Sequence, residues 1–524
     1  MRIGVLSDIH DNFLKSEKAL NLFKNNKMEF VFSFPPQELD LMRRIYCFAQ
    51  KRKVKLYLVG GILRDLFLKR TNENPDLDFC LKKNAIAFGN KLTRELRCGF
   101  VILDKERGAC RLVKKIKDRV YTLDFTDFRG KTIADDLLRR DFTINAMAVE
   151  LEKVIKSSLS KRNYLMENLN DFLIDPCQGR QDLKSKIIRT VNKKGFDDDP
   201  LRILRAFSFS AMLGFTIDKV TLKLASLKAQ KLTRVSFERI RDELFKILDG
   251  PNSFESLVKL DHSKLLGIIF PEIETMRGLK QGPYHHLDVL KHTLEAIRQL
   301  EILIQELKNN QELQNYLNEV ISGERKRSAI LKLGVLLHDI GKPPALRHED
   351  GKTKFHGHER IGQEITREIV QRLRLSNDEL DSLSKMVFWH LRPGYLADNE
   401  EITPRATFRY FRDAAQEGVS ILLISIADQR ATKGPLTSLG SRIHHEKVAL
   451  DLIKEYFRNK KKKKIERLIN GDDLIKKFKL EPSILIGKIL REVEELQAIG
   501  KIRNKTEALQ IAKKMIGKKK KGGR

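Results

Sequence analysis

The sequence predicts an α+β protein in which a head with a small mixed sheet precedes a neck, a further domain and a tail that are all helical. Two observations predict this fold class. Between residues 56 and 128, short apolar or alternating runs have the length and spacing of strands. From about residue 256 onward, apolar residues recur at helical spacing. A chain of 524 residues is also too long for one hydrophobic core, so several domains are expected.

The expected domains follow from shifts in composition and periodicity. Pro35-Pro36 marks the end of an N-terminal piece, and the lysines at 460–464 indicate a solvated linker before the tail. We therefore expect an extension at 1–37, a head at 38–175, a helical neck at 176–255, an all-helical domain at 256–452 and a basic tail at 453–524.

The charge balance favours a polyanionic partner. Lysine and arginine number 101 against 70 aspartates and glutamates, a formal net charge of +31, and a field of that sign concentrates nucleic acid. Surface ion pairing is the alternative, but the excess is too large for pairing alone. No uncharged apolar run approaches a membrane span and the N-terminus has no signal-peptide pattern, so no membrane partner is expected. The five cysteines form no CxxC pair, which indicates a reducing, cytoplasmic location.

The extension begins with a strand–loop–helix pattern that places Asp8 and His10 at the end of the strand. This opening resembles that of calcineurin-like metallophosphoesterases. That family needs further Asp, Asn and His clusters downstream, and the stretch FVFSFPP at 30–36 lacks the expected Gly-Asp. We interpret the extension as an appended piece without catalysis.

The head opens with KLYLVGGILRD at 55–65, followed by PDLDF at 75–79. An apolar strand runs into Gly60-Gly61, where a helix carrying Arg64 begins. Glycines let the backbone approach a triphosphate closely, and the helix start and the arginine add positive charge. Because strand side chains alternate, Asp76 and Asp78 share one face. Paired carboxylates of this kind suit Mg²⁺ and nucleotidyl transfer.

A third carboxylate is expected near this pair. After a helix at 84–97, further strands are expected at 99–104, 109–116 and 119–128, and the last of them offers Asp124 and Asp127. Polymerase-type sites use a third carboxylate to assist the attacking 3′-hydroxyl. On spacing alone, either residue fits.

In this order and spacing, the segments resemble the head of the class II tRNA nucleotidyltransferase and bacterial poly(A) polymerase family, which has a polymerase beta-like fold. The stretch LRRDFTINA at 138–146 matches a second signature of that family, and the similarity extends over roughly residues 50–515. The resemblance implies Mg²⁺ as cofactor and selects Asp124 as the third catalytic carboxylate beside Asp76 and Asp78. The nucleotide-binding residues that it implies are Gly60, Gly61, Arg64, Arg139, Arg140, Asp141, Asn145, Asp199, Arg202 and Arg205.

Two of these elements have a plain structural alternative. Asp199 and Arg202 lie three apart and so on one helical face, and the resemblance implies that the pair reads the base edge of incoming C or A. Asp199 could instead cap a helix that starts with a proline, a role that Asp198 could also fill. Arg140 and Asp141 could likewise pair with neighbours at a helix entry.

A second constellation of histidines and aspartates lies in the helical region. Imidazole and carboxylate ligands on separate helices are how an all-helical domain builds a metal pocket. The pattern, which includes FHGHE at 355–359 and LLHDIGK at 336–342, resembles the HD phosphohydrolase superfamily. An HD domain can be active or persist as a structural adaptor, and Lys342 is expected to contact phosphate. The resemblance implies a divalent transition metal on His292, His338, Asp339 and Asp428, and a second ion on His358 and His390.

We expect a tRNA nucleotidyltransferase that uses CTP, ATP or both. Many full CCA-adding members carry a long flexible loop between the third carboxylate and the second signature. Here only FTDFRGKTIADDLL separates Asp124 from Arg139, as in CC-adding members. This favours CC addition, with a separate A-adding enzyme acting in sequence.

Other functions remain open. Within the family, the alternatives are full CCA addition and A or poly(A) addition. From another class, the HD site could be the main activity, as a metal-dependent phosphohydrolase whose head only holds RNA. An RNA-binding protein without catalysis is disfavoured, because binding alone gives no reason for the ordered series of motifs.

Overall fold

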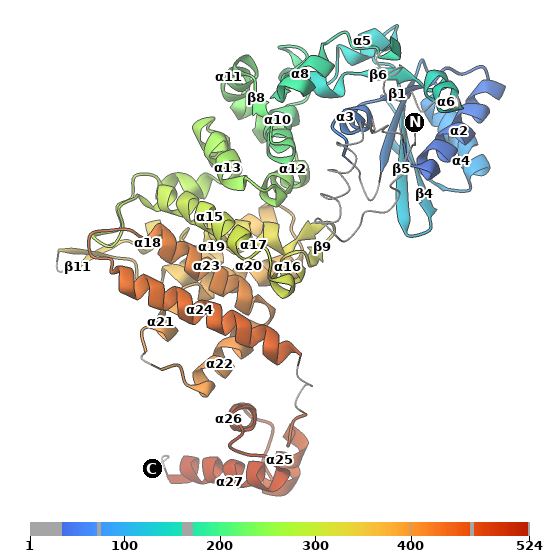
Figure 1. Ribbon diagram of the computed structural model, residues 1–524. Helices are drawn as coiled ribbons and strands as arrows, with labels where there is room; N and C mark the ends of the chain where they lie inside the picture. Colours follow the sequence, from blue (N-terminus) through green and yellow to red (C-terminus); the bar gives the residue numbers. More distant parts are fainter. Residues whose placement is uncertain are drawn as a thin grey trace, which may run out of the picture. The chain divides into compact units, whose positions relative to one another are not determined.

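The computed structural model describes residues 34–70, 75–159, 171–349, 351–399, 401–461 and 466–521. The chain divides into two compact units, and Figure 1 labels their helices and strands. The first extends to Arg202 and includes Phe215–Ala225, and the second comprises Ile203–Gly214 and the chain from Ser226 onward. The phosphoesterase-like pattern with Asp8 and His10 lies outside the described residues. Among the described helices, none combines the length and apolar character needed to cross a membrane.

The first unit is built on a six-stranded mixed sheet with the strand order β3-β4-β5-β2-β1-β6. Only β2 and β5 pair in parallel; the other neighbours are antiparallel. The strands are β1 (Tyr57–Val59), β2 (Asp76–Leu81), β3 (Gly99–Asp104), β4 (Ala109–Ile116), β5 (Arg119–Asp127) and β6 (Ala148–Glu150).

One face of this sheet is apolar and carries two helices, α2 (Pro36–Lys51) and α4 (Ala85–Leu96). Aromatic rings link the layers: Phe48 of α2 contacts Phe88 of α4, and Phe88 contacts Phe125 of β5. Phe125 also stacks on Phe79 of β2, with the ring centroids 5.0 Å apart. Alternation along β2 and β5 then sends the intervening polar side chains to the opposite face.

Part of that opposite, polar face is covered. The short helix α5 (Ile133–Leu137) places Ile133 and Leu137 in a buried cluster with Val59 and Cys80. Only residues 128–132 separate the end of β5 from α5, and Thr132 and Asp135 form a capping box at the start of that helix. This unit also contains α3 (Gly61–Phe67), η1 (Thr143–Asn145), α6 (Leu151–Leu159), α8 (Gly179–Ser185), β7 (Ile187–Ile188), α9 (Gly195–Asp198) and β8 (Thr216–Ile217).

The predicted neck is divided between the two units. Helix α10 (Leu201–Leu213) begins in the first unit and continues in the second, and α11 (Lys219–Leu227) likewise begins in the first unit and ends in the second. Three expected boundaries fall inside helices: 37/38 lies within the first turn of α2, 255/256 lies within α13 (Ser253–His262), and 452/453 lies within α24 (Leu439–Lys460). These segments remain single helices because backbone hydrogen bonds continue across them, without the glycine or proline that ends a helix.

The second unit is helical apart from two short hairpins, β9 (Val320–Ser322) with β10 (Arg325–Lys326) and β11 (Arg347–Glu349) with β12 (Lys352–Lys354). Its C-terminal helices α25 to α27 share a small core of their own around Leu474, Ile489 and Ala512. The predicted fold class is therefore confirmed. The remaining helices of this unit are η2 (Ala229–Arg234), α12 (Phe237–Asp249), α14 (Leu265–Ile269), η3 (Pro271–Met276), α15 (Val289–Glu306), α16 (Gln311–Leu317), α17 (Arg327–Leu337), α18 (Lys342–Ala345), α19 (His358–Arg372), α20 (Asn377–Trp389), α21 (Arg392–Ala397), α22 (Pro404–Ala414), η4 (Ala415–Glu417), α23 (Gly418–Ala431), α25 (Gly471–Phe478), α26 (Ile484–Ala498) and α27 (Lys505–Lys521).

Candidate active site and metal centre

Three carboxylates meet on the polar face of the head sheet. Asp78 of β2 pairs in register with Asp124 of β5, and Asp76 pairs with Thr122. The Thr122 hydroxyl donates to Asp76. Arg111, from β4, donates to both carboxylate oxygens of Asp124 at 2.8 and 2.9 Å. The expected triad of Asp76, Asp78 and Asp124 is thus assembled by strand pairing, with one arginine holding its third member.

The electrostatics of the triad favour an added cation. Burial and the neighbouring charge of Asp124 raise the pKa of Asp78 to about 6, although Arg140 acts in the opposite direction. Three carboxylates this close repel one another, and a divalent ion with oxygen ligands relieves that repulsion. Asp127 does not share this role, because its carboxylate accepts from the backbone N–H of Ala85 at 2.7 Å, at the start of α4.

Gly60 lies directly against this site. Its backbone has φ +77°, a conformation that favours glycine. A Cβ at this position would lie 3.1 Å from Oδ2 of Asp78 and 3.3 Å from Nη1 of Arg140. Arg140 is itself fixed by Asp136, at 3.2 Å, and by the sulfur of Cys80. The glycine therefore keeps open the space between the Asp78 carboxylate and a fixed arginine.

Arg64, Asp141 and Asn145, all expected to bind nucleotide, form one buried network. Arg64 donates to both oxygens of Asp65, at 2.9 and 3.0 Å, and to the side-chain oxygen of Asn145 at 2.9 Å. Asn145 in turn donates to Asp141 at 3.3 Å. Gly61, the first residue of α3, lies next to Arg64. The network joins α3 to η1, and its role in binding phosphate stays a prediction.

Asp199 and Arg202, the two residues predicted to read the base, make contacts within the protein that stabilise the fold. The carboxylate of Asp199 accepts from the N–H of Leu201 at 3.3 Å, so the helix-capping alternative is confirmed. Arg202 is buried and donates to the carbonyls of Arg139 and Arg140 at 3.0 and 3.3 Å, which ties α10 to the second signature. Base selection by this pair stays a prediction. Arg205, one turn further along α10, lies in the second unit, 4.0 Å from Glu243 of α12.

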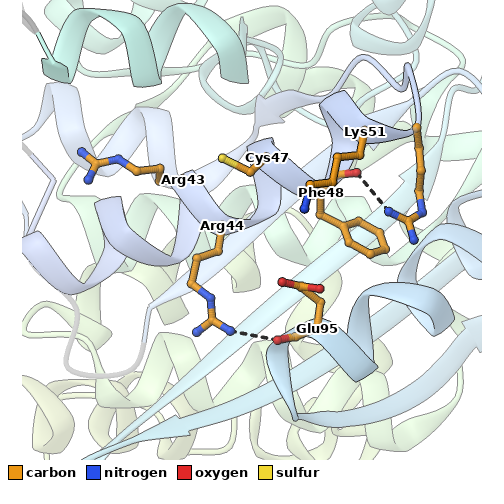
Figure 2. A pocket seen from close by; sticks show the side chains of 7 residues that line it. Arg43, Arg44, Cys47, Phe48, Lys51 and Glu95 are labelled. Atoms are coloured by element: carbon orange, nitrogen blue, oxygen red, sulfur yellow. Dashed lines mark hydrogen bonds between the residues drawn. The ribbon is translucent and has the colours of Figure 1, made fainter.

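A separate pocket opens on the helix-covered side of the same sheet (Figure 2). Arg44 donates to the carbonyl of Glu95, at the end of α4, and the Arg52 guanidinium lies 3.5 Å above the Phe48 ring. Its cations therefore cover helix ends and an aromatic ring, away from the carboxylate triad. The lining residues are Arg43, Arg44, Cys47, Phe48, Lys51, Arg52 and Glu95.

The second unit gathers the predicted metal ligands into two groups, in each of which the ligand atoms lie within 4.8 Å of one another. Asp339 lies between the groups, because its Oδ2 is 3.2 Å from Nε2 of His338 and its Oδ1 is 3.5 Å from Nε2 of His358. Nε2 of His292 is 2.8 Å from Asp428. The first group is His292, His338 and Asp428, and the second is Asp339, His358 and His390.

The orientation of the imidazoles fits a cation. Nδ1 of His338, His358 and His390 donates to the backbone carbonyl three residues earlier, at 2.7, 2.8 and 2.6 Å. A carbonyl only accepts, so the proton lies on Nδ1 and, in the neutral ring, Nε2 presents a lone pair. Nε2 of His358 and Nε2 of His390 face each other at 3.3 Å, and Nε2 of His338 is buried without a hydrogen-bond partner. A metal ion would satisfy all three atoms, with carbonyl partners holding each ring in place.

The charges around this centre agree with that fit. Burial, together with His338 and His358, lowers the pKa of His390 to about 3, so this imidazole stays neutral. Burial opposes a charge on His338, yet Asp339 and Asp428 raise its pKa to about 10. Without a metal ion this ring therefore takes a second proton on Nε2, and a bound ion would replace that proton as the positive charge beside the two aspartates. The second group offers neutral nitrogen ligands.

Sequence reasoning missed two neighbours of the metal centre. Gln281 accepts from Lys342 at 2.7 Å, and Lys342 is 2.6 Å from Asp339, so the lysine predicted to contact phosphate is bound to a predicted metal ligand. The ring of His285 lies 4.9 Å from that of His292. By contrast, His356 is exposed and belongs to neither group. A cluster of polar residues shortly before a ligand helix is the only signal that could have indicated Gln281 and His285.

Comparisons with known proteins match most of the chain. Family models described as the poly A polymerase head domain and as a probable RNA- and SrmB-binding site of polymerase A match residues 56–189 and 214–276. Models of the HD domain and of tRNA nucleotidyltransferase domain 2 match residues 289–433 and 363–512.

Individual relatives extend over nearly the whole chain. An A-adding tRNA nucleotidyltransferase of Deinococcus radiodurans is 29% identical, with 86% of this chain and 93% of the relative covered. A CC-adding tRNA nucleotidyltransferase of Thermus thermophilus is 28% identical, with 86% and 91% covered. The solved Thermotoga maritima CCA-adding enzyme complexed with tRNA has a TM-score of 0.58 at 24% identity and covers 92% of this chain and 96% of its own. At that identity, the structural match shows the fold alone.

Proposed function

Because the chain belongs to the CCA- and CC-adding tRNA nucleotidyltransferase family and carries an HD domain, we propose that it adds cytidylate residues from CTP to the 3′ end of tRNA. In this reaction the 3′-hydroxyl of the RNA attacks the α-phosphorus of the nucleotide. The new phosphodiester bond forms as the bond to pyrophosphate breaks. The observation that carries the proposal is the triad Asp76, Asp78 and Asp124 on one face of two parallel strands.

Each head residue has a task in this proposal. Asp76 and Asp78 would hold Mg²⁺, which when bound neutralises charge on the attacking and leaving oxygens. Asp124, oriented by Arg111, receives the proton of the 3′-hydroxyl. Gly60 leaves space beside Arg140 for the phosphates. The bases are selected by Asp199 and Arg202, whose backbone and carbonyl contacts fix their positions.

Addition of two C residues, without A, is favoured by the connection after β5. Residues 128–132 lead directly into the capping box of α5, so this connection is too short to form the long flexible loop of many full CCA-adding members. The relatives include both A-adding and CC-adding enzymes at nearly equal identity, 29% and 28%, so similarity alone does not choose between them. Under this proposal a separate enzyme adds the final A.

A test uses the full chain, Mg²⁺ and three tRNA transcripts that end at the discriminator base, at C and at CC. Each is incubated with CTP, ATP or both, and products are resolved to single nucleotides. Addition of two C residues with no A, even on the CC-ending transcript, supports the proposal. Completion to CCA, or addition of A alone, overturns the CC assignment while leaving the reaction class intact.

The second unit supports a second candidate function, a metal-dependent phosphohydrolase. The facing Nε2 atoms of His358 and His390 and the position of Asp339 between two ligand groups favour a pair of transition-metal ions. Such ions activate water for attack on phosphate esters. Hydrolysis of a chromogenic phosphodiester that needs added Mn²⁺ or Ni²⁺ and disappears in Asp339→Ala would support it. Equal hydrolysis by this variant would refute it.

A further inference from the structure

The polar face of the head sheet continues beyond the carboxylate triad as an open apolar surface. We call this the valine surface and define it as Val101 of β3, Val113 of β4 and Val120 of β5. Val101 is 52% exposed and Val120 is 39% exposed. Gly99, opposite Val113, adds no side chain that could cover it. Two exposed valines with the half-buried Val113 between them, on the face that carries the carboxylates, form an apolar surface that a ligand can contact.

Strand register places the valine surface in line with the catalytic residues. Val101 is directly opposite Arg111, Arg111 is opposite Asp124, and Asp124 is opposite Asp78. Directly paired residues project from the same face of a sheet. One row of side chains therefore leads from the edge strand to the reacting carboxylates.

The direction of the reaction assigns this surface to one substrate. Gly60 and Arg140 lie on the β1 side of Asp78, and that side is covered by α5. If the leaving pyrophosphate is held there, an in-line attack brings the 3′-hydroxyl from the opposite side, over β5 and β4. Neighbouring strands are about 4.8 Å apart, so β4 and β3 are where the nucleotide that carries this hydroxyl must lie.

We propose that the valine surface binds the 3′-terminal nucleotide of the RNA substrate. This inference rests on the proposed function and adds the site of the primer end. Apolar side chains can pack against the face of any base and its ribose, and they contain no hydrogen-bonding group that reads base identity. Such tolerance is required, because the terminal base changes after each addition. Lys115, opposite Val120 on the same face, places a positive charge where the RNA backbone would pass.

The test compares Val101→Glu with Ile102→Glu in the full-length protein. Ile102 is the next residue of β3 and is 40% exposed, but it pairs with Cys110 and so faces the other side of the sheet. Because Val101→Glu replaces an apolar contact by a carboxylate that repels the RNA phosphates, it should raise the KM for tRNA at least about fivefold. The KM for CTP should stay unchanged. Ile102→Glu should behave like the wild type, and the apolar Val101→Leu should raise the KM for tRNA less than Val101→Glu does.

A second measurement does not depend on any variant folding. A tRNA with 4-thiouridine as its last nucleotide is irradiated with the wild-type protein, and the crosslinked peptide is sequenced. A crosslink within residues 99–120 supports the proposal. Crosslinks confined to other segments, or equal KM values for Val101→Glu and Ile102→Glu, overturn it.

Two further outcomes distinguish a failure of this inference from a failure of the proposed function. If Val101→Glu changes only the oligomeric state measured by light scattering, the surface is an interface between copies of this chain and the proposal falls. If the wild type incorporates no nucleotide into any tRNA, the proposed function itself has failed. Incorporation by the wild type with no effect of Val101→Glu overturns this inference alone.

Discussion

Replacing Gly60 by alanine should damage the head in two measurable ways. The backbone at this residue has φ +77° and ψ −138°, a region that residues with a Cβ rarely adopt. Holding alanine there should lower the free energy of unfolding by about 1–3 kcal/mol. The new methyl group would lie 3.1 Å from Oδ2 of Asp78 and 3.3 Å from Nη1 of Arg140. Arg140 is bound to Asp136 and Cys80, so the carboxylate of Asp78 has to move.

The expected loss of activity follows from that movement. A misplacement of about 1 Å costs on the order of 10²-fold in rate, so a shift of a few tenths of an ångström should reduce kcat for nucleotide incorporation about tenfold. Urea denaturation measures the stability, and single-turnover incorporation of labelled CMP into tRNA measures the rate.

The adjacent glycine provides the control. Gly61 is the first residue of α3 and lacks a positive φ, and a Cβ there would lie 3.3 Å from the Arg64 guanidinium, which is bound to Asp65 and Asn145. Gly61→Ala adds no strained backbone and does not approach Asp78, so it should lose less stability and less activity than Gly60→Ala. If Gly60→Ala is as stable and as active as Gly61→Ala, the reasoning about the space beside Asp78 is refuted.

Three further predictions concern the pH response, the metal centre and the neck. Because the pKa of Asp78 is raised to about 6 from 3.8, the folded metal-free head binds the proton more tightly than the unfolded chain. Its stability should rise as the pH falls from above 6 toward 4, whereas incorporation should fall below pH 6. Because Mg²⁺ competes with the proton for Asp78, a higher Mg²⁺ concentration should shift the acidic fall of the pH–rate profile to lower pH. A profile that does not shift would count against Asp78 as a metal ligand. Asp339→Ala should lose bound transition metal, measured by mass spectrometry, with incorporation unchanged; full metal retention would contradict the ligand assignment. Arg202→Ala leaves the carbonyls of Arg139 and Arg140 without this buried donor and should cost about 1–3 kcal/mol in urea denaturation, while no loss would show that the contacts are dispensable.

The strands of the head could be predicted because their pattern is local. The expected strands at 99–104, 109–116 and 119–128 correspond closely to β3, β4 and β5. Alternation in Asp-Leu-Asp placed Asp76 and Asp78 on one face, as the structure confirms, with Leu77 buried on the other.

Contacts across strands and between distant segments could not be predicted in this way. The pairing of Arg111 with Asp124 depends on which strands lie next to each other, and the raised pKa of Asp78 depends on the same arrangement. Asp127 occupies the same strand as Asp124 but faces the start of α4. Only the family resemblance separated the two in sequence.

The metal centre shows the same limit. A histidine such as His292 on an apolar helix has no local sign of being a ligand, because its partners come from other helices by tertiary packing. The resemblance to HD domains supplied the residues. His338 and His390 cap the C-terminal ends of α17 and α20, and their Nδ1 atoms donate to carbonyls of the last turns. These bonds orient the rings, and they could not be predicted without the positions of the helix ends.

The central claim is that the head transfers nucleotides with the carboxylates of β2 and β5. The most direct measurement is incorporation of labelled CMP into a tRNA transcript that lacks CCA, by the wild type, by the double variant Asp76→Ala/Asp78→Ala and by Asp339→Ala. We expect incorporation by the wild type and by Asp339→Ala. The double variant should still bind tRNA but incorporate nothing. Appreciable incorporation by the double variant, or its loss only in Asp339→Ala, would contradict the account.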